Sequence, residues 1–286
     1  MEIVFKSLIE CKIEDIITAW NRGFEEYFVK LEMTPELFFN RIANEGLSLP
    51  HSIVAFDKHE PVAIVVNGIR TIGGKKYSWN GGTGIAKDYR GSGVSKLLME
   101  EKLKIYEEEG IEVATLEAIK KNERAISLYQ RYGYEIVDEL VHLSGMREVD
   151  QTQAVSIHKE SLRPEQLPFL TIYQENVPWQ CQWQSMKQGE AQIFTDMEGK
   201  PLGYALYRRV WNAQGQLERV LLYQLHLVCD PEQGFLNAIF ANICGRTDQP
   251  VTFMTINTSV KNPIVPFLLA EGFQKTAEQV QMVKKR

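Results

Sequence analysis

In the stretch DYRGSGVSKLLMEEKL, residues 88–103, glycine and serine with minimal side chains stand where a helix should begin. The glycine-rich run YSWNGGTGIA precedes it as an expected strand, and apolar residues at helical spacing follow it. A helix N-terminus carries unpaired N–H groups and the positive end of the helix dipole, so it attracts phosphate. The turn consists of small or cationic residues around one valine: Arg90, Gly91, Ser92, Gly93, Val94 and Ser95. It therefore predicts a pyrophosphate site.

Two common nucleotide-binding motifs are excluded at this turn. The phosphate loop G-x-x-x-x-G-K-[ST] is absent, and G-x-G-x-x-G fails because Lys96 stands at its last position. The sequence supports neither an ATP-hydrolysing loop nor a dinucleotide-binding fold.

The totals of the 286-residue chain restrict the class of protein. With 44% hydrophobic and 24% charged residues, the chain can bury one large core or two ordinary ones. Its net charge of −5 gives no basic footprint for nucleic acid. Four scattered cysteines (11, 181, 229 and 244) suggest reduced thiols, and the five histidines lack metal-ligand spacing. We therefore expect no metal site.

The chain shows no targeting or membrane signal. Its first residues, MEIVFKSLIE, lack the basic start and long apolar run of a signal peptide. The longest apolar stretches, such as VAIVV, are too short to span a bilayer. A cytoplasmic protein without membrane partners is expected.

The order of predicted elements indicates a mixed fold that occurs twice. The first half is predicted to have helices over 13–28, 34–46, 94–109 and 122–133, and strands over 2–9, 52–57, 61–70, 75–86, 113–119 and 134–143. The order predicts an α/β fold in which helices flank a central mixed (α+β) sheet. A polar stretch over 144–153 sets the expected boundary between domains 1–146 and 147–286. The second half repeats the order, with helices expected over 164–174, 232–244 and 263–270.

Two motifs of the first half resemble those of the GCN5-related N-acetyltransferase (GNAT) superfamily. TGIAKDYRGSGVSKLL resembles its acyl-CoA motif R/Q-x-x-G-x-G/A, with Ser95 in place of the final Gly or Ala. NERAISLYQRYGYE resembles N-x-x-A-x-x-x-Y-x-x-x-G-F. The resemblance covers residues 3–143, and it extends to a bacterial subgroup of acetyltransferases whose second half has a region like VPWQCQWQSM. It implies a tandem GNAT-like acyl-CoA N-acyltransferase fold.

The resemblance also implies residue roles. The pantetheine arm of acetyl-CoA would pair with the end of the strand at Gly84, Ile85 and Ala86, where an N–H of Ile85 or Ala86 could face the oxyanion. Its pyrophosphate would bind residues 90–95. Asn122 would contact pantetheine, or serve only as a helix N-cap. Tyr129 would protonate the departing thiolate as general acid, or serve only in packing.

The sequence indicates the residues that would bind the acceptor less specifically than those that would bind the cofactor. Glu117, on the strand beside the cofactor, is the candidate base, with a solvated or salt-bridged strand residue as the alternative. Glu25, Glu26 and Tyr27 are candidates for a cationic substrate, although such charges are common on a solvated helix face.

The second half is predicted to be a degenerate GNAT-like domain that does not bind CoA. Its echo of the second motif has Leu268 where a tyrosine is expected. Asp230 and Glu232 put negative charge where phosphate needs donors. We expect this half to complete the sheet or to wall the acceptor cleft. Trp179, Trp183 and Trp211 are candidates to line that cleft or to lie in the core.

These observations predict an acetyl-CoA-dependent N-acetyltransferase. Its acceptor would be the primary amine of a small molecule, attacking the thioester directly in a ternary complex. The alternatives are a protein amine as acceptor, a non-catalytic acyl-CoA sensor, and a protein-interaction module. The chain would be a monomer or a homodimer.

Overall fold

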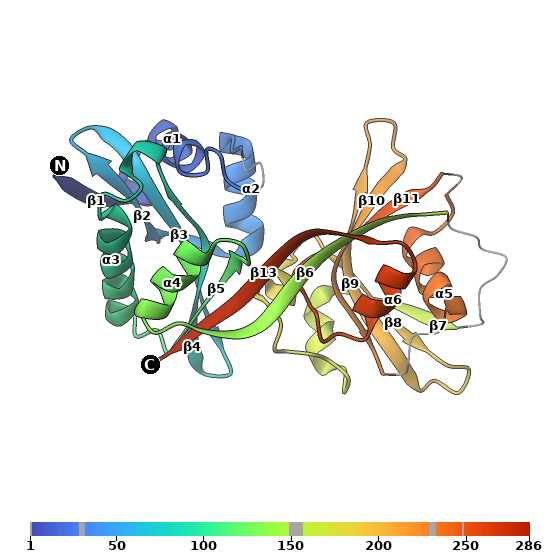
Figure 1. Cartoon of the computed structure of the whole chain (residues 1–286). Helices are drawn as coiled ribbons and strands as arrows, with labels where there is room; N and C mark the ends of the chain where they lie inside the picture. The colour runs from blue at the N-terminus through green and yellow to red at the C-terminus, as the bar shows by residue number, and fades with distance from the viewer. Residues whose placement is uncertain (1, 29–31, 149–156, 229–232, 248) are drawn as a thin grey trace. The chain divides into compact units, whose positions relative to one another are not determined.

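The computed structural model describes residues 2–28, 32–148, 157–228, 233–247 and 249–286, and the chain forms two compact units (Figure 1). Unit 1 comprises Met1–Val137 and Gln281–Arg286, and unit 2 comprises Asp138–Val280. The expected boundary at residue 146 differs from this division. The polar residues after 143 continue a strand, because strand pairing uses backbone groups and tolerates polar side chains.

Unit 1 confirms the predicted mixed α/β class and element order. Its elements are β1 (Ile3–Ser7), α1 (Ile13–Gly23), α2 (Pro35–Glu45), β2 (Leu47–Asp57), β3 (Glu60–Ile72), β4 (Lys75–Ile85), α3 (Val94–Glu108), β5 (Val113–Ile119) and α4 (Glu123–Arg131). Short 3-10 turns, η1 (Leu8–Glu10) and η2 (Lys87–Tyr89), follow β1 and β4. The sheet order is β1-β2-β3-β4-β5-β13, where β13 (Gln274–Lys285) supplies its last residues to this unit. Pairing is antiparallel from β1 to β4 and parallel between β4 and β5.

The predicted ends are confirmed for helix α2, whereas the predicted C-terminal end of helix α1 is wrong. Helix α2 has the predicted signals, because Thr34 Oγ1 accepts a hydrogen bond from Leu37 N and Gly46 adopts a positive φ of 66°. Helix α1 was predicted to reach residue 28, which is wrong, because it ends at Gly23. At that point the helix touches the sheet: a Cβ on Gly23 would lie 2.8 Å from the Gly84 backbone.

The helices of unit 1 cover opposite faces of its sheet. Gly82 and Gly84 of β4 lie against Trp20 and Gly23 of α1. Strand side chains alternate between faces, and Ile85 accordingly packs in the cluster that includes Val94 and Leu98 of α3. The part of β4 between residues 82 and 85 is thus covered by α1 on one face and α3 on the other.

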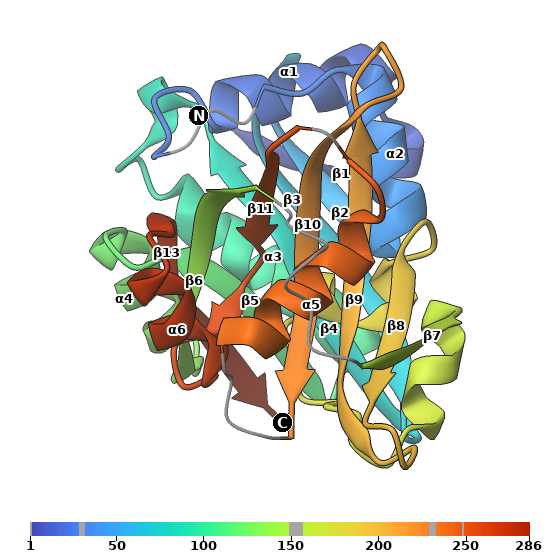
Figure 2. The ribbon, with the colours of Figure 1, turned by 90° about the vertical axis from the view of Figure 1, so that its right-hand side faces the viewer.

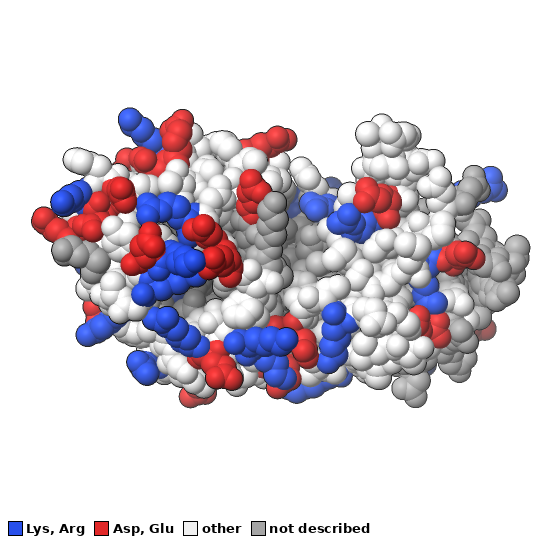
Figure 3. Space-filling view, turned by 45° about the horizontal axis from the view of Figure 1, so that its top comes forward, with Lys and Arg blue, Asp and Glu red and all other residues white. Residues whose placement is uncertain are grey.

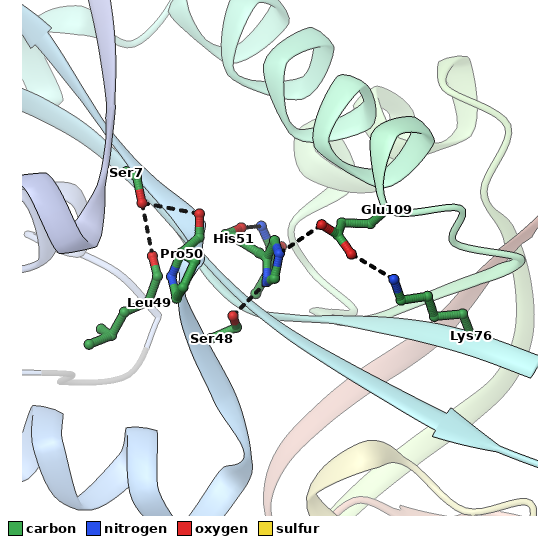
Figure 4. A network of polar contacts seen from close by, with 8 residues as sticks. Ser7, Ser48, Leu49, Pro50, His51, Lys76 and Glu109 are labelled. Atoms are coloured by element: carbon green, nitrogen blue, oxygen red, sulfur yellow. Dashed lines mark hydrogen bonds and ion pairs between the residues drawn. The ribbon is translucent and has the colours of Figure 1, made fainter.

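A polar network fixes the end of α3 (Figure 4). The Glu109 carboxylate pairs with Lys76 Nζ at 2.6 Å and with His51 Nε2 at 3.0 Å. His51 Nδ1 lies 2.7 Å from Ser48 Oγ. The Lys76 ammonium, with a smaller effect from His51, lowers the pKa of Glu109. These contacts join the C-terminal end of α3 to strands β2 and β4 of the sheet against which it packs.

Unit 2 has a corresponding arrangement. Its sheet order is β13-β6-β11-β10-β9-β8-β7, with residues 274–280 of β13 in this unit, and β10 and β11 are its parallel pair. The strands are β6 (Glu135–Arg147), β7 (His158–Leu162), β8 (Glu190–Thr195), β9 (Pro201–Trp211), β10 (Leu217–Leu227), β11 (Val251–Thr255) and β12 (Thr258–Ser259). Figure 2 shows α5 (Gln233–Cys244) across the strands, where Phe240 packs 4.5 Å from Phe253 between ring centroids. Helix α6 (Ile264–Ala270) precedes β13.

The helix predicted over 164–174 is wrong. Residues Pro164–Phe169 form the 3-10 helix η3 with Pro168 inside it, and proline lacks the N–H that a longer α-helix needs. Two further 3-10 turns, η4 (Trp179–Cys181) and η5 (Trp183–Ser185), carry the tryptophan-rich stretch.

The described ranges show no cluster of His, Cys, Asp or Glu suited to a metal ion. Within the same ranges, every helix falls short of the length and hydrophobicity that crossing a membrane requires. Cys11, Cys181 and Cys244 are free thiols, and Cys229 lies outside the described residues.

Candidate functional site

The site is centred on the place where β4 and β5 stop pairing. Their register runs from Tyr77–Val113 to Asn80–Leu116, and β4 then continues to Ile85. A register shift against β3, where Val66 pairs with Gly82 and Asn67 with Asn80, bends β4 directly after its last pair with β5. We call the β4 edge over 81–86, together with the end of β5 over 117–119, the seam.

Backbone directions at the seam separate the two predicted oxyanion donors. Ala86 N donates to Val62 O at 2.8 Å, so its N–H faces β3. Neighbouring residues of a strand direct their N–H groups to opposite edges, so Ile85 faces the seam. Of the two residues, Ile85 therefore has its N–H at the seam.

The glycines of β4 are required by packing on the α1 side. A Cβ on Gly82 would lie 2.7 Å from Trp20, and one on Gly84 would lie 3.0 Å from Gly23 and Phe24. Gly84, predicted to bind cofactor, therefore has a packing reason of its own.

The turn before α3 has an accessible helix N-terminus. Gly91 and Gly93 adopt positive φ values of 88° and 95°, and the space in front of Gly93 is open for at least 4 Å. Lys96 N donates to Gly93 O as the first turn of the helix closes, so the N–H groups just before it are the orphan donors of the helix start. Val94 is fully buried and fixes the turn against the core. Ser92 Oγ donates to Tyr89 O at 2.7 Å, which stabilises the turn.

Arg90 has a different place from the one predicted. Its guanidinium folds back, and it donates to Ile85 O at 3.0 Å, Glu25 O at 2.8 Å and Gly23 O at 3.3 Å. It thus joins the end of α1 to the end of β4. Another cation that the sequence analysis missed, Arg124, lies beside the turn, with Nη2 3.5 Å from where a Cβ on Gly91 would be.

Tyr129 lies on the α3 side of the seam, and its side chain is buried. Its hydroxyl interacts with Thr83 and Asn80, which are themselves joined by a bond of 2.8 Å from Asn80 Nδ2 to Thr83 Oγ1. Burial raises the pKa of Tyr129 to about 12, and these two neighbours moderate the rise. Asn122 caps α4 by accepting from Ala125 N at 3.2 Å. Asn80 and Thr83 were not predicted from the sequence, because they match no position of either motif.

Glu117 lies on the opposite face of the sheet, beside Trp79. Trp79 Nε1 donates to Glu117 Oε2 at 2.7 Å, and Glu117 Oε1 is buried without a hydrogen-bond partner within the described ranges. Burial raises the pKa of Glu117 to about 7, and the Trp79 hydrogen bond partly offsets the rise. A carboxyl of this kind can gain and lose a proton near neutral pH.

The three predicted substrate residues do not gather into one anionic site. Glu25 is exposed, and exposed Glu26 pairs with Lys87 at 2.9 Å, which lowers the pKa of Glu26. Tyr27 is half-buried, and its hydroxyl interacts with Asn122. Burial is the main cause that raises the pKa of Tyr27. The structure therefore brings Tyr27 to the cofactor residues and leaves both glutamates at the surface.

Unit 2 has a comparable seam that its own side chains fill. Pairing of β10 with β11 ends at Leu222–Thr255, and Asn262 Nδ2 then donates to Leu225 O at 3.2 Å. Gln224 Nε2 donates to Cys181 O at 2.7 Å across the same region.

Leu268 occupies the place in unit 2 that Tyr129 has in unit 1. Phe273 N donates to Leu268 O as Tyr134 N donates to Tyr129 O, and the Leu268 side chain is fully buried. Asp230 and Glu232 lie outside the described residues. Of the three tryptophans, Trp179 is buried, Trp183 is half-buried and Trp211 is exposed.

Charge on the surface shown in Figure 3 is mixed in sign. Lys and Arg side chains alternate with Asp and Glu over unit 1 on this face. Attraction for an anion at the turn therefore depends on local groups, such as Arg124 and the α3 N-terminus, rather than on a broad positive area of this face.

Comparisons with known proteins identify the family of the N-terminal region and the fold of the chain. The sequence model of the Acetyltransferase (GNAT) family matches residues 13–134. A search of curated proteins finds no matching sequence. The chain is similar in structure to a GCN5-related N-acetyltransferase from Sphaerobacter thermophilus (TM-score 0.65, 13% identity, 99% of this chain and 95% of that one). It is also similar to a tandem GNAT protein from the clavulanic acid biosynthesis pathway (TM-score 0.65, 10% identity, 99% and 98%).

A third similar structure is a GCN5-related N-acetyltransferase from Anabaena variabilis (TM-score 0.58, 17% identity, 99% of this chain and 72% of that one). At these identities the structures establish the fold, and the sequence match establishes the family for the N-terminal region. The chain thus has a tandem GNAT fold, and its residues 13–134 belong to the GNAT superfamily as an acetyltransferase domain.

Proposed function

We propose that unit 1 transfers an acetyl group from acetyl-CoA to the primary amine of a small molecule. The observation that carries the proposal is the pair of groups on opposite faces of one seam. One is a buried carboxyl whose pKa is about 7, and the other is a buried tyrosine hydroxyl. General bases and acids of acyl transfer need these properties.

The residues at the seam fit acetyl-CoA. The α3 N-terminus over 91–95 and Arg124 would hold its pyrophosphate, because open space lies before Gly93. The unpaired edge of β4 would bind the pantetheine amides as a strand would, beside Asn122 and Tyr27. When bound, acetyl-CoA supplies an acyl group activated as a thioester.

Side chains and a backbone N–H of the protein then transfer the protons and stabilise the developing negative charge. Glu117 accepts the proton that the attacking amine must lose. Ile85 N–H, at the seam, would stabilise the negative charge that develops on the acyl oxygen. Tyr129 Oη donates its proton to the leaving sulfur. An acceptor that arrives as an ammonium ion loses two protons. Glu117 takes the first, and the second is released once the nitrogen–carbon bond has formed and the carbon–sulfur bond breaks; it replaces the proton that Tyr129 gives to sulfur.

The acceptor is inferred from the charge at the seam. Glu117, when ionised, is a buried carboxylate without a cationic side chain bonded to it among the described contacts, so an ammonium ion would be attracted there. This favours an amine over a neutral acceptor. Small size of the acceptor, a monomeric or dimeric assembly, and a cytoplasmic location without nucleic acid or membrane partners stay predictions.

A non-catalytic acyl-CoA sensor is the second candidate. Its supporting observation is that Tyr129 is buried and packs 5.9 Å from Tyr134, as a structural tyrosine would. Release of free CoA on addition of small primary amines would decide for the enzyme. Tight binding without any release would decide for the sensor.

Substitution of Glu117 by glutamine tests the assigned base. The wild-type kcat/KM is expected to fall as pH drops below about 7, because Glu117 then takes up a proton. Glu117→Gln keeps an acceptor for Trp79 but cannot take a proton, so kcat/KM should fall about 100-fold and lose this acid-side dependence. The measurement is CoA thiol release against pH.

Glu107→Gln makes the same chemical change on the exposed face of α3 and should leave both quantities unchanged. An unaltered acid-side dependence in Glu117→Gln would show that another group is the base.

A further inference from the structure

One buried charge near the seam takes no part in the mechanism above. Lys102 lies in α3 and is completely buried, and its Nζ has no hydrogen-bond partner among the described residues. Burying an unpaired ammonium is costly, and an apolar residue would fill the position at lower cost. The position therefore calls for an explanation beyond packing.

Three tyrosine rings surround this amine, and we call Tyr106, Tyr129 and Tyr134 the tyrosine cage. Lys102 Nζ lies 5.1 Å from the ring centroid of Tyr134 and 5.5 Å from those of Tyr106 and Tyr129. Rings at this distance stabilise a cation through their electron-rich faces. One of the three is the residue assigned as general acid.

The cage contains no carboxylate that contacts the amine. In the part of the chain that the structure describes, the titratable groups that face Lys102 are the three tyrosines, from α3, from α4 and from the segment before β6. Nearby polar groups are neutral: Tyr106 Oη donates to Asn67 Oδ1 at 2.8 Å, and Ser78 Oγ is buried. Among the described residues, the positive charge thus acts on the rings without an anion in contact with it. Burial alone lowers the pKa of Lys102 to about 7, so its charge changes near neutral pH.

We propose that Lys102 is a positioning residue for the acetyl transfer, whose ammonium stabilises the negative charge that Tyr129 gains as it releases its proton. The inference rests on the proposed function, in which Tyr129 is the acid. Lys102 does not touch the reacting atoms; it acts through the Tyr129 ring. The stabilisation exists only while Lys102 is protonated, and it fades as pH rises through about 7.

The test compares Lys102→Met with the unaltered protein across pH. Methionine has a similar length and no charge, so the fold should persist and the free energy of unfolding should not decrease. The ratio of wild-type to variant kcat should be about 10 well below pH 7 and approach 1 above it. Taking the ratio removes the pH dependence that protonation of Glu117 gives to both kcat values. Lys104→Met, in an exposed position of the same helix, should give a ratio near 1 throughout.

A second arm asks whether Lys102 acts through Tyr129. In the Tyr129→Phe background, Lys102→Met should change kcat by less than about twofold, because the group it serves is gone. If Lys102→Met does not fold, Lys102→Gln supplies a neutral, polar replacement for the same measurements. A ratio independent of pH, or an unchanged effect in the Phe background, would overturn the inference alone. Absence of transfer by the unaltered protein would overturn the proposed function, and the inference with it.

Discussion

Tyr129→Phe is expected to lower kcat by about 10²- to 10³-fold while leaving the affinity for acetyl-CoA within about twofold. The substitution removes only the hydroxyl that interacts with Thr83 and Asn80 at the seam. The ring remains, so the contacts with Tyr134 and Lys102 persist and the fold should be kept. Without the hydroxyl, the departing thiolate has no proton donor at that place. Steady-state release of CoA and calorimetric binding give the two quantities.

Tyr132→Phe is the matched control, because its hydroxyl donates to Lys96 O at 3.4 Å and interacts with Glu100, so none of its described contacts is with Thr83 or Asn80. It should retain full kcat. If Tyr129→Phe also retained full kcat, Tyr129 would be a packing residue and the proton would come from elsewhere.

Gly93→Glu is expected to weaken acetyl-CoA binding by about 100-fold or more, which is at least about 2.7 kcal/mol. The new carboxylate would occupy the open space before the α3 N-terminus, where it would compete with phosphate for the same N–H groups. The substitution also strains the backbone, because Gly93 has a φ of 95°. Calorimetric titration with acetyl-CoA measures the loss.

Gly74→Glu, at the turn between β3 and β4, is the control that distinguishes backbone strain from blocking of the phosphate site. Gly74 has a φ of 80° and also faces open space, so the substitution should strain the backbone about as much as Gly93→Glu does, but away from the seam. It should bind acetyl-CoA normally. Equal affinity of Gly93→Glu and the unaltered chain would contradict the pyrophosphate assignment.

Local signals were sufficient for much of the fold. Helix α2 begins and ends where Thr34 and Gly46 predicted, because capping depends on a few neighbouring residues. The end of α1 was not predictable in this way. Its apolar pattern continues to Phe28, but the helix stops where Gly23 meets Gly84, a contact between residues far apart in sequence.

The division into units shows the same limit. Residues 281–286 belong to unit 1, where Arg286 N donates to Glu112 O at 3.0 Å. No local pattern in the last strand reveals which sheet it will join. The expectation that unit 2 does not bind CoA stays a prediction, supported by Leu268 and by the bonds that fill its seam.

For the site, the sequence motifs located the backbone better than the side chains. The turn over 90–95 and the start of α4 are where the motifs placed them. The directions of Arg90 and Arg124 depend on α1 and α4, which a linear motif does not describe. Lys102 did leave a signal: it interrupts the apolar series Val94, Leu98 and Tyr106 at intervals of four, a position that faces the core.

Calorimetric titration of the intact chain with acetyl-CoA tests most directly the central claim of one working site per chain, in unit 1. The account predicts one site per chain, lost in Gly93→Glu and kept in Gly74→Glu. Two sites would show that unit 2 also binds CoA, and no binding would contradict the assignment of the seam as an acyl-CoA site.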